Sequence, residues 1–126
     1  MRDVGRACES AACDFLAKKG YKIIARNYTV KGGELDIIAE NKDFIVFVEV
    51  KARKARGGEY GFTSPYGRPS DAVNEEKMKH MRQAANAFIR EHGYKKKIPR
   101  NDVIEMSIHE YSDCVCLEIN HIENAF

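Results

Sequence analysis

The sequence predicts an α/β domain in which a central mixed β-sheet is flanked by helices, in the order α-β-β-β-α-β-β. Two segments carry apolar residues at helical spacing, and five segments are rich in β-branched and aromatic residues or alternate between apolar and polar ones. A length of 126 residues is that of one ordinary domain, so we expect residues 1–126 to fold as a single unit. That length is sufficient to bury a core without metal or disulfide cross-links.

The first helix is predicted over residues 3–19, and a strand follows over residues 21–30. The apolar stripe of the helix consists of Val4, Cys8, Ala11 and Phe15. Gly20 comes next and is a typical C-terminal cap, and the two lysines before it suit the negative end of the helix dipole. The sequence Lys31-Gly32-Gly33 predicts a turn after the strand.

A β-hairpin is predicted next, with strands over residues 34–40 and 44–53 joined by a tight turn at 41–43. Because side chains alternate between the two faces of a strand, one face of this hairpin is apolar throughout. This face consists of Leu35, Ile37, Ala39, Phe44, Val46, Val48 and Val50. We expect it to pack against a helix.

The remainder of the chain predicts one loop, one long helix, one basic linker and two closing strands. In chain order these cover residues 54–69, 71–92, 95–99, 102–111 and 115–119. The loop is rich in glycine, Ser70 or Asp71 caps the start of the helix, and Gly93 ends it.

Composition and charge limit the functional classes. No apolar run approaches the roughly 20 residues of a membrane-spanning helix, and charged residues interrupt the first 20 positions, so we expect a cytoplasmic protein without a membrane partner. The net charge of +2 hides an asymmetry, because residues 51–100 hold 13 basic and 5 acidic groups whereas residues 101–126 hold 6 acidic groups and no basic one. A basic middle segment favours a polyanionic partner, although an ordinary solvated surface can have the same composition.

The cysteine and histidine residues do not predict a metal site. The pairs Cys8/Cys13 and Cys114/Cys116 lack the spacing of paired zinc ligands, so we expect four reduced thiols. The histidines also lack ligand spacing, and we expect no special role for them. They are His80, His92, His109 and His121.

The second face of the hairpin is apolar near the turn and ionisable away from it. With a two-residue turn, Asp36 lies opposite Glu49 and Glu34 lies opposite Lys51. Two opposed carboxylates repel each other, and a divalent cation such as Mg²⁺ would compensate them. Lys51 points the same way as Glu49 and would hold or activate a water beside such a metal. The alternative is a mixed-charge ladder in which Lys51 neutralises Glu34 or Glu49.

These residues resemble a known pattern. The segments Gly33-Glu34-Leu35-Asp36-Ile37-Ile38-Ala39 and Phe47-Val48-Glu49-Val50-Lys51-Ala52-Arg53 are similar to the YraN-like uncharacterised protein family, which belongs to the restriction-endonuclease-like PD-(D/E)XK nuclease superfamily. The resemblance covers residues 5–106 and includes Gly5, Glu9, Arg26-Asn27, Tyr66-Gly67-Arg68-Pro69, Ala72-Val73, Lys77 and Arg100-Asn101-Asp102-Val103. Two departures are Asn101, where a Phe is usual, and a longer, glycine-rich loop at 54–65.

The resemblance implies a restriction-endonuclease-like fold and a nuclease site that depends on Mg²⁺ or Mn²⁺. Carried over residue by residue, Asp36, Glu49 and the backbone carbonyl of Val50 would bind the metal, and Lys51 would position the attacking water. Glu9 would reach the site from the first helix, directly or through water; the alternative is an ordinary exposed glutamate. The pattern is also similar to archaeal Holliday-junction resolvases, which are small dimers, so a homodimer is an expected assembly.

Two further sets of residues are candidates. Lys77 lies within the apolar stripe of the second helix, so it either extends to the helix end or faces the site. The resemblance favours the site, where Glu34 would be a second supporting residue. Basic and aromatic residues around the loop suit phosphate contacts and base stacking, unless they form an ordinary surface loop. These residues are Arg53, Lys54, Arg56, Tyr60, Arg68, Lys95 and Lys96.

The function that these observations favour is metal-assisted hydrolysis of phosphodiester bonds in DNA. The expected enzyme is an endonuclease of DNA repair or recombination acting on branched or single-stranded DNA. One alternative is a nucleic-acid-binding protein that keeps the nuclease fold without useful turnover. Another is a structural protein whose carboxylates form only a salt-bridged ladder. The intact set of Asp36, Glu49 and Lys51 favours the first hypothesis.

Overall fold

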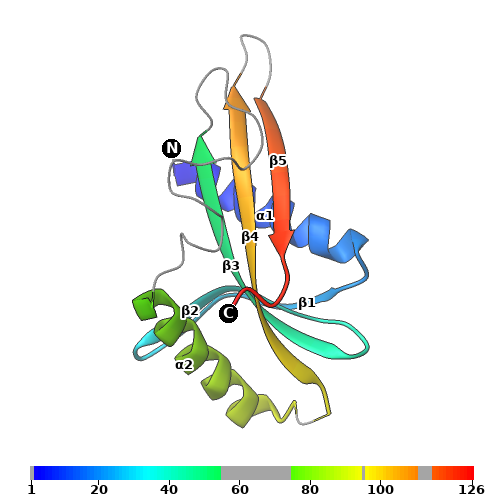
Figure 1. The fold of residues 1–126 in the computed structure, drawn as a ribbon, viewed down its shortest axis with the longest axis vertical. Coiled ribbons are helices and arrows are strands. Elements are labelled where there is room, and N and C mark those ends of the chain that lie inside the picture. The colour runs from blue at the N-terminus through cyan, green and yellow to red at the C-terminus, as the bar shows by residue number, and fades with distance from the viewer. Residues whose placement is uncertain (1, 55–74, 95, 111–114) are drawn as a thin grey trace.

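The computed structural model describes residues 2–54, 75–94, 96–110 and 115–126. Its elements follow the predicted α-β-β-β-α-β-β order, which confirms an α/β fold (Figure 1). They are α1 (Arg2–Lys18), β1 (Lys22–Val30), β2 (Gly33–Glu40), β3 (Phe44–Lys54), α2 (Glu75–His92), β4 (Ile98–Glu110) and β5 (Val115–Ile122).

The strands form one five-stranded mixed sheet in the order β1-β2-β3-β4-β5. All neighbouring strands are antiparallel except β3 and β4, which run parallel. A parallel pair needs a crossover connection, and α2 lies in the one between β3 and β4. The contacts between elements place α1 against β1, β2 and β3, and α2 mainly against β2, beside which Figure 1 shows it.

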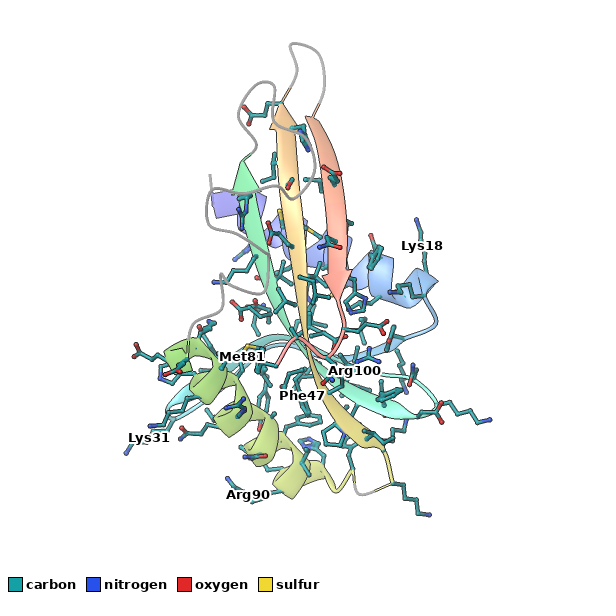
Figure 2. All side chains as sticks on the ribbon, in the orientation of Figure 1. Lys18, Lys31, Phe47, Met81, Arg90 and Arg100 are labelled. Carbon is teal, nitrogen blue, oxygen red and sulfur yellow. The ribbon has the colours of Figure 1, made fainter. Side chains whose placement is uncertain are left out.

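The two helices cover opposite faces of the sheet, because alternate residues of β3 enter different cores. The α1 core contains Cys8, Ala12, Leu16, Ile37, Ala39, Val46, Val48, Ile104 and Met106. The α2 core contains Leu35, Ile38, Ile45, Phe47, Met81, Ala84, Phe88 and Val103. Figure 2 shows Phe47 and Met81 in the region between the sheet and α2.

The predicted apolar face of the hairpin is confirmed with one exception. Its members pack in or beside the α1 core, apart from Leu35. The prediction for Leu35 was wrong, because this residue is buried in the α2 core. At this point β2 is no longer paired with β3, and Leu35 follows its partner on β1, Tyr28, which packs against the same core.

The register of the hairpin agrees with the prediction near the turn. Asn41 N–H donates to Phe44 O over 3.0 Å, and the pairs between β2 and β3 then run from Glu40↔Ile45 to Ile37↔Val48. The pairing ends there, one position before Asp36 and Glu49. Beyond this point β3 continues beside β4 as far as Lys54↔Ile108. The two carboxylates therefore lie where β2 and β3 part.

Several predicted boundaries need correction. Strand β4 begins at Ile98 instead of 102, so Ile98 and Pro99, which were predicted to lie in the linker, belong to the strand. Ile98 N–H donates to Asp43 O over 2.9 Å, and a proline is tolerated at the start of a strand. Strand β5 extends to Ile122 instead of 119. Gly20 and Gly93 follow the two helices with positive φ values of 97° and 68°, as predicted for caps.

Neither helix, within the described part of the chain, is long and apolar enough to cross a membrane.

Candidate functional site

Asp36 is held at the end of the β2–β3 pairing by a bond to the neighbouring strand. Its Oδ2 accepts a hydrogen bond of 2.8 Å from the backbone N–H of Val50. A strand-to-strand backbone bond would otherwise use that donor, so the carboxylate takes the place of a rung in the ladder. This contact fixes the orientation of Asp36 next to Glu49, the residue that precedes Val50.

Glu49 is a buried carboxylate with one unsatisfied oxygen. The residue is 4% exposed. Its Oε1 lies 3.4 Å from Lys77 Nζ and 3.6 Å from Lys51 Nζ, whereas its Oε2 is buried and has no hydrogen-bond partner. A buried polar atom without a partner is costly and needs an explanation, such as a bound ion.

The electrostatic environment of Glu49 favours the protonated form when no cation is bound. Burial is the main reason that its pKa rises to about 7, and the charge of Asp36 raises it further. Lys77 and Lys51 oppose this rise without cancelling it. The two lysines therefore do not offset the combined effect of burial and of the Asp36 charge on Glu49.

Lys77 brings α2 into the site. Its Nζ lies 2.9 Å from Glu34 Oε1 on β2, in addition to the contact with Glu49 on β3. Burial alone would lower the pKa of Lys77, but the hydrogen bond to Glu34 and the charge of Glu49 raise it on balance. The structure thus agrees with a position of Lys77 and Glu34 at the site and not at an exposed helix end.

Gly33 explains how α2 approaches β2 so closely. A Cβ atom at this position would lie 2.6 Å from His80 O and 2.9 Å from Ala84 N, which are both backbone atoms of α2. Only a residue without a side chain avoids these contacts. Gly33, the first residue of β2, therefore allows the close approach by which Lys77 meets the two glutamates.

The ionisable row continues along β3 beyond Glu49. Lys51 and Arg53 follow on the same face, because they are two and four residues further along the strand. Arg53 Nε lies 2.8 Å from Oε1 of Glu105 on β4, which is fully buried. The sequence analysis missed Glu105, although a glutamate within the apolar run Val103–Ile108 was a usable signal.

Glu9 lies apart from this cluster in the contacts that the structure gives. It is half-buried on α1 and forms an ion pair with Arg26 of β1 at 3.8 Å. No described contact joins it to Asp36 or Glu49. Its participation in the site stays a prediction.

The predicted nucleic-acid contacts fall largely outside the described residues. Arg56, Tyr60, Arg68 and Lys95 belong to that group. Arg53 and Lys54 end strand β3, and Lys96 is exposed before β4. Of this set, Arg53 has a described contact, the ion pair with Glu105, and Glu105 neighbours Lys51 in the register of β3 and β4.

A second polar cluster, which the sequence analysis also missed, joins β4, β5 and the end of α1. Asp102 is fully buried and accepts bonds from Arg100 to both oxygens, each at 2.9 Å. His121 Nε2 lies 2.6 Å from Asp102 Oδ2, and Lys19 Nζ lies 2.8 Å from His121 Nδ1. These structural contacts of His121 were not foreseen, since spacing along the chain does not reveal partners on different elements.

The donor set at Asp36 and Glu49 suits a hard cation. Within the described ranges no three His, Cys, Asp or Glu side chains meet as a metal cluster. Magnesium needs only one or two carboxylates and retains several waters, so a carboxylate pair with a backbone carbonyl is a sufficient protein contribution. Of the four thiols predicted to be reduced, Cys8 and Cys13 are free, whereas Cys114 and the side chain of Cys116 lie outside the described part of the chain.

Fold and site together define a small α/β protein with a carboxylate pair and two lysines at the point where a β-hairpin opens. The chain belongs to the uncharacterised protein family UPF0102, whose family model matches residues 8–106. This confirms the predicted resemblance to the YraN-like family; membership of the nuclease superfamily stays a prediction.

Curated relatives support the family assignment over nearly the whole chain. A UPF0102 protein of Caldicellulosiruptor saccharolyticus is 38% identical over 125 residues, which covers 99% of this chain and 98% of the relative. A UPF0102 protein of Caldanaerobacter subterraneus is 39% identical over 126 residues, with 99% and 95% covered. One from Carboxydothermus hydrogenoformans is 39% identical over 103 residues, with 82% and 80% covered.

Proposed function

We propose that this protein is a metal-dependent endonuclease that hydrolyses phosphodiester bonds in DNA. The observation that carries the proposal is the buried Oε2 of Glu49, which lacks a hydrogen-bond partner in a site that already contains Asp36 and Lys51. A salt-bridged ladder would be expected to satisfy both oxygens of a buried carboxylate. A bound ion would satisfy this oxygen, and the second carboxylate beside it favours a cation.

The residues present fit Mg²⁺ or Mn²⁺. Asp36, Glu49 and the backbone carbonyl of Val50 would hold the ion, all three being hard oxygen donors. A bound ion would supply stabilisation of negative charge on a phosphate oxygen and a water of lowered pKa. Counting Lys51 and Lys77 against Asp36, Glu49 and Glu34, the site has one unbalanced negative charge when all are ionised, and this favours a cation.

The chain's own residues have separable tasks. Asp36 is oriented by the Val50 N–H before any ligand arrives, so little reorganisation is needed on binding. Lys51 lies beside Glu49, where it would position an attacking water by donating a hydrogen bond to it. Lys77 holds Glu34 and Glu49 together and keeps both carboxylates oriented. The sheet supplies a rigid frame for these groups.

DNA is the substrate that charge favours, with branched or single-stranded forms first. The segment 51–100 that follows the site carries 13 basic and 5 acidic residues. Phosphate contacts from such residues give affinity that depends on salt and not on sequence. We also propose a homodimer, because cutting a branched duplex requires two active sites; this rests on analogy at the level of the fold.

The test is cleavage of labelled single-stranded, duplex and four-way-junction DNA in Mg²⁺ or Mn²⁺. Wild type is compared with Asp36→Asn and Lys51→Ala, and Asp43→Asn serves as a matched control because Asp43 is an exposed carboxylate in the turn of the same hairpin. We expect wild type and the control to cleave DNA and the two site variants to lose cleavage.

Two other results would change the assignment. Metal binding that Asp36→Asn abolishes, without cleavage of any of the three DNA forms, would indicate a nucleic-acid-binding protein without turnover. A wild-type protein that binds no divalent metal would contradict the metal site itself.

A further inference from the structure

The face of the sheet that carries Glu49 continues past the site, toward the end of β3, with polar side chains, of which Glu105 and Ser107 are buried. β3 and β4 run parallel with Glu49↔Val103, Lys51↔Glu105 and Arg53↔Ser107 as neighbours. These six side chains share one face, because residues two apart in a strand point the same way. The described α2 core reaches Val103, and the next residues on this face of β4 are Glu105 and Ser107.

Glu105 is an unusual residue for this position. It is fully buried, neither of its carboxylate oxygens has a hydrogen-bond partner, and burial raises its pKa despite the opposing charge of Arg53. A buried ion pair adds little to stability compared with apolar residues of the same size. Stability alone therefore does not account for a carboxylate here, whereas orientation of Arg53 does.

Arg53 connects this buried carboxylate with the surface. Its side chain is 27% exposed, and its Nε faces Glu105 Oε1 at 2.8 Å. A guanidinium is a rigid plane, so this ion pair at Nε, which lacks hydrogen-bond geometry, still restricts the directions in which the rest of the group can lie. Arginine suits phosphate oxygens better than lysine does for the same reason.

The spacing along β3 separates Arg53 from the reacting phosphate. A strand advances about 3.3 Å per residue, so Arg53 lies about 7 Å beyond Lys51 and about 13 Å beyond Glu49. A group at that distance reaches a phosphate next to the one held at Asp36 and Glu49. We propose that Arg53 binds this flanking phosphate of the same nucleic-acid strand, and that Glu105 is the positioning residue that orients Arg53 for it. This subsite rests on the proposed function.

The experiment measures binding of a single-stranded oligonucleotide in Ca²⁺, so that no cleavage is needed. The variants are Arg53→Ala, Glu105→Gln and their combination, and Lys79→Ala is the control for loss of one exposed positive charge. Each subsite variant should weaken binding about tenfold and lower the salt dependence by about one phosphate contact. The combination should be no weaker than Arg53→Ala alone, because Glu105 acts through Arg53.

A second measurement locates the contact on the nucleic acid. An uncharged methylphosphonate replaces one phosphate at a time along the oligonucleotide. One replacement should weaken binding by the wild type and leave binding by Arg53→Ala unchanged. Metal affinity, measured by calorimetry without nucleic acid, should be the same in wild type, Arg53→Ala and Glu105→Gln. Thermal unfolding confirms that each variant is folded.

The possible failures are distinguishable. If Arg53→Ala binds like Lys79→Ala, or if the two substitutions have additive effects, the subsite is wrong while the proposed function stands. If Glu105→Gln loses metal affinity, Glu105 belongs to the metal site and is not a positioning residue for Arg53. A wild type that binds metal but no oligonucleotide would overturn the nucleic-acid substrate and the subsite together.

Discussion

Asp36 Oδ2 accepts the backbone N–H of Val50 over 2.8 Å, across the point where β2 and β3 separate. This bond joins one candidate metal ligand to the residue whose carbonyl is another. It also places Asp36 close enough to Glu49 for its charge to raise the pKa of that residue. The candidate site therefore lies at the point where the hairpin opens.

Substitution Asp36→Asn should lower the pKa of Glu49 from its wild-type value of about 7. The amide keeps an oxygen that can accept from Val50 N–H, but it removes the negative charge that opposes ionisation of Glu49. Burial of Glu49 remains, so its pKa should stay above 4.5. NMR titration of the Glu49 side-chain carboxyl in metal-free protein measures this, with Asp43→Asn as the control. An unchanged pKa would mean that the two carboxylates do not interact.

The stability of the metal-free protein should fall as pH rises through the titration of Glu49. Its pKa is raised from 4.5 to about 7 on folding, so the folded state binds more protons in this window than the unfolded state. The stabilising contribution is complete below pH 4.5 and lost above pH 7, with a size of up to about 3 kcal/mol. Urea unfolding at several pH values measures it. Glu49→Gln should remove this part of the pH dependence. If the free energy of unfolding of the variant falls with pH as steeply as that of wild type, the raised pKa of Glu49 is contradicted.

Substitution Gly33→Ala should move α2 away from the site. The added methyl group meets two backbone atoms of α2 at 2.6 and 2.9 Å, and backbone cannot rotate away as a side chain can. We expect a loss of about 1–3 kcal/mol in the free energy of unfolding. Gly20→Ala is the comparison, since a Cβ there meets nothing within 4 Å and only the positive φ is strained. A smaller loss for Gly33→Ala than for Gly20→Ala would contradict the close packing.

Substitution Asp102→Ala should destabilise the fold by about 3–5 kcal/mol, because it leaves Arg100 buried without its partner. The double variant Arg100→Met, Asp102→Leu should recover most of this loss. Denaturant unfolding of the single and double variants measures both effects. If the double variant does not recover stability, other contacts of Asp102, such as those with His121 and Asn124, account for the loss.

Asp102 should also contribute to acid unfolding. Burial alone would raise its pKa, but hydrogen bonds from His121 and Arg100 lower it on balance below 3.8. Its stabilising contribution is therefore present above pH 3.8 and is lost as the pH falls through the lower value in the folded state. The Arg100→Met, Asp102→Leu variant should lack this loss between pH 4 and the acid limit. Circular dichroism during acid titration gives the comparison.

The hairpin and its register were predictable because their determinants are local. Asn41 Oδ1 accepts from Asp43 N–H at 3.0 Å and from Phe44 N–H at 2.8 Å, a turn that the sequence at 41–43 indicates. The turn fixes the register, and the register brings Asp36 near Glu49. Lys77 and Glu34 were also named from the sequence, one from its place in an apolar stripe and both with the help of the family pattern.

The partners of Glu105 and His121 and the core that Leu35 enters could not be read from local sequence, because they depend on other elements. The pairing of Glu105 with Arg53 depends on the parallel register of β3 and β4, which no local pattern specifies. His121 meets Asp102 only after β5 has paired with β4. Leu35 lies in the α2 core, although the alternation of side chains along β2 predicts the α1 core. The residues of β2 before Ile37 are not paired with β3, so strand separation and twist decide which core Leu35 enters.

Calorimetric titration of Mg²⁺ and Mn²⁺ into the metal-free protein tests the central claim most directly. We expect one site per chain in wild type and in Asp43→Asn, and a loss of affinity of at least about tenfold in Asp36→Asn and in Glu49→Gln, because each removes a charged oxygen ligand. Equal affinity in wild type and these two site variants would contradict a metal centre at the opening of the hairpin, and with it the proposed nuclease.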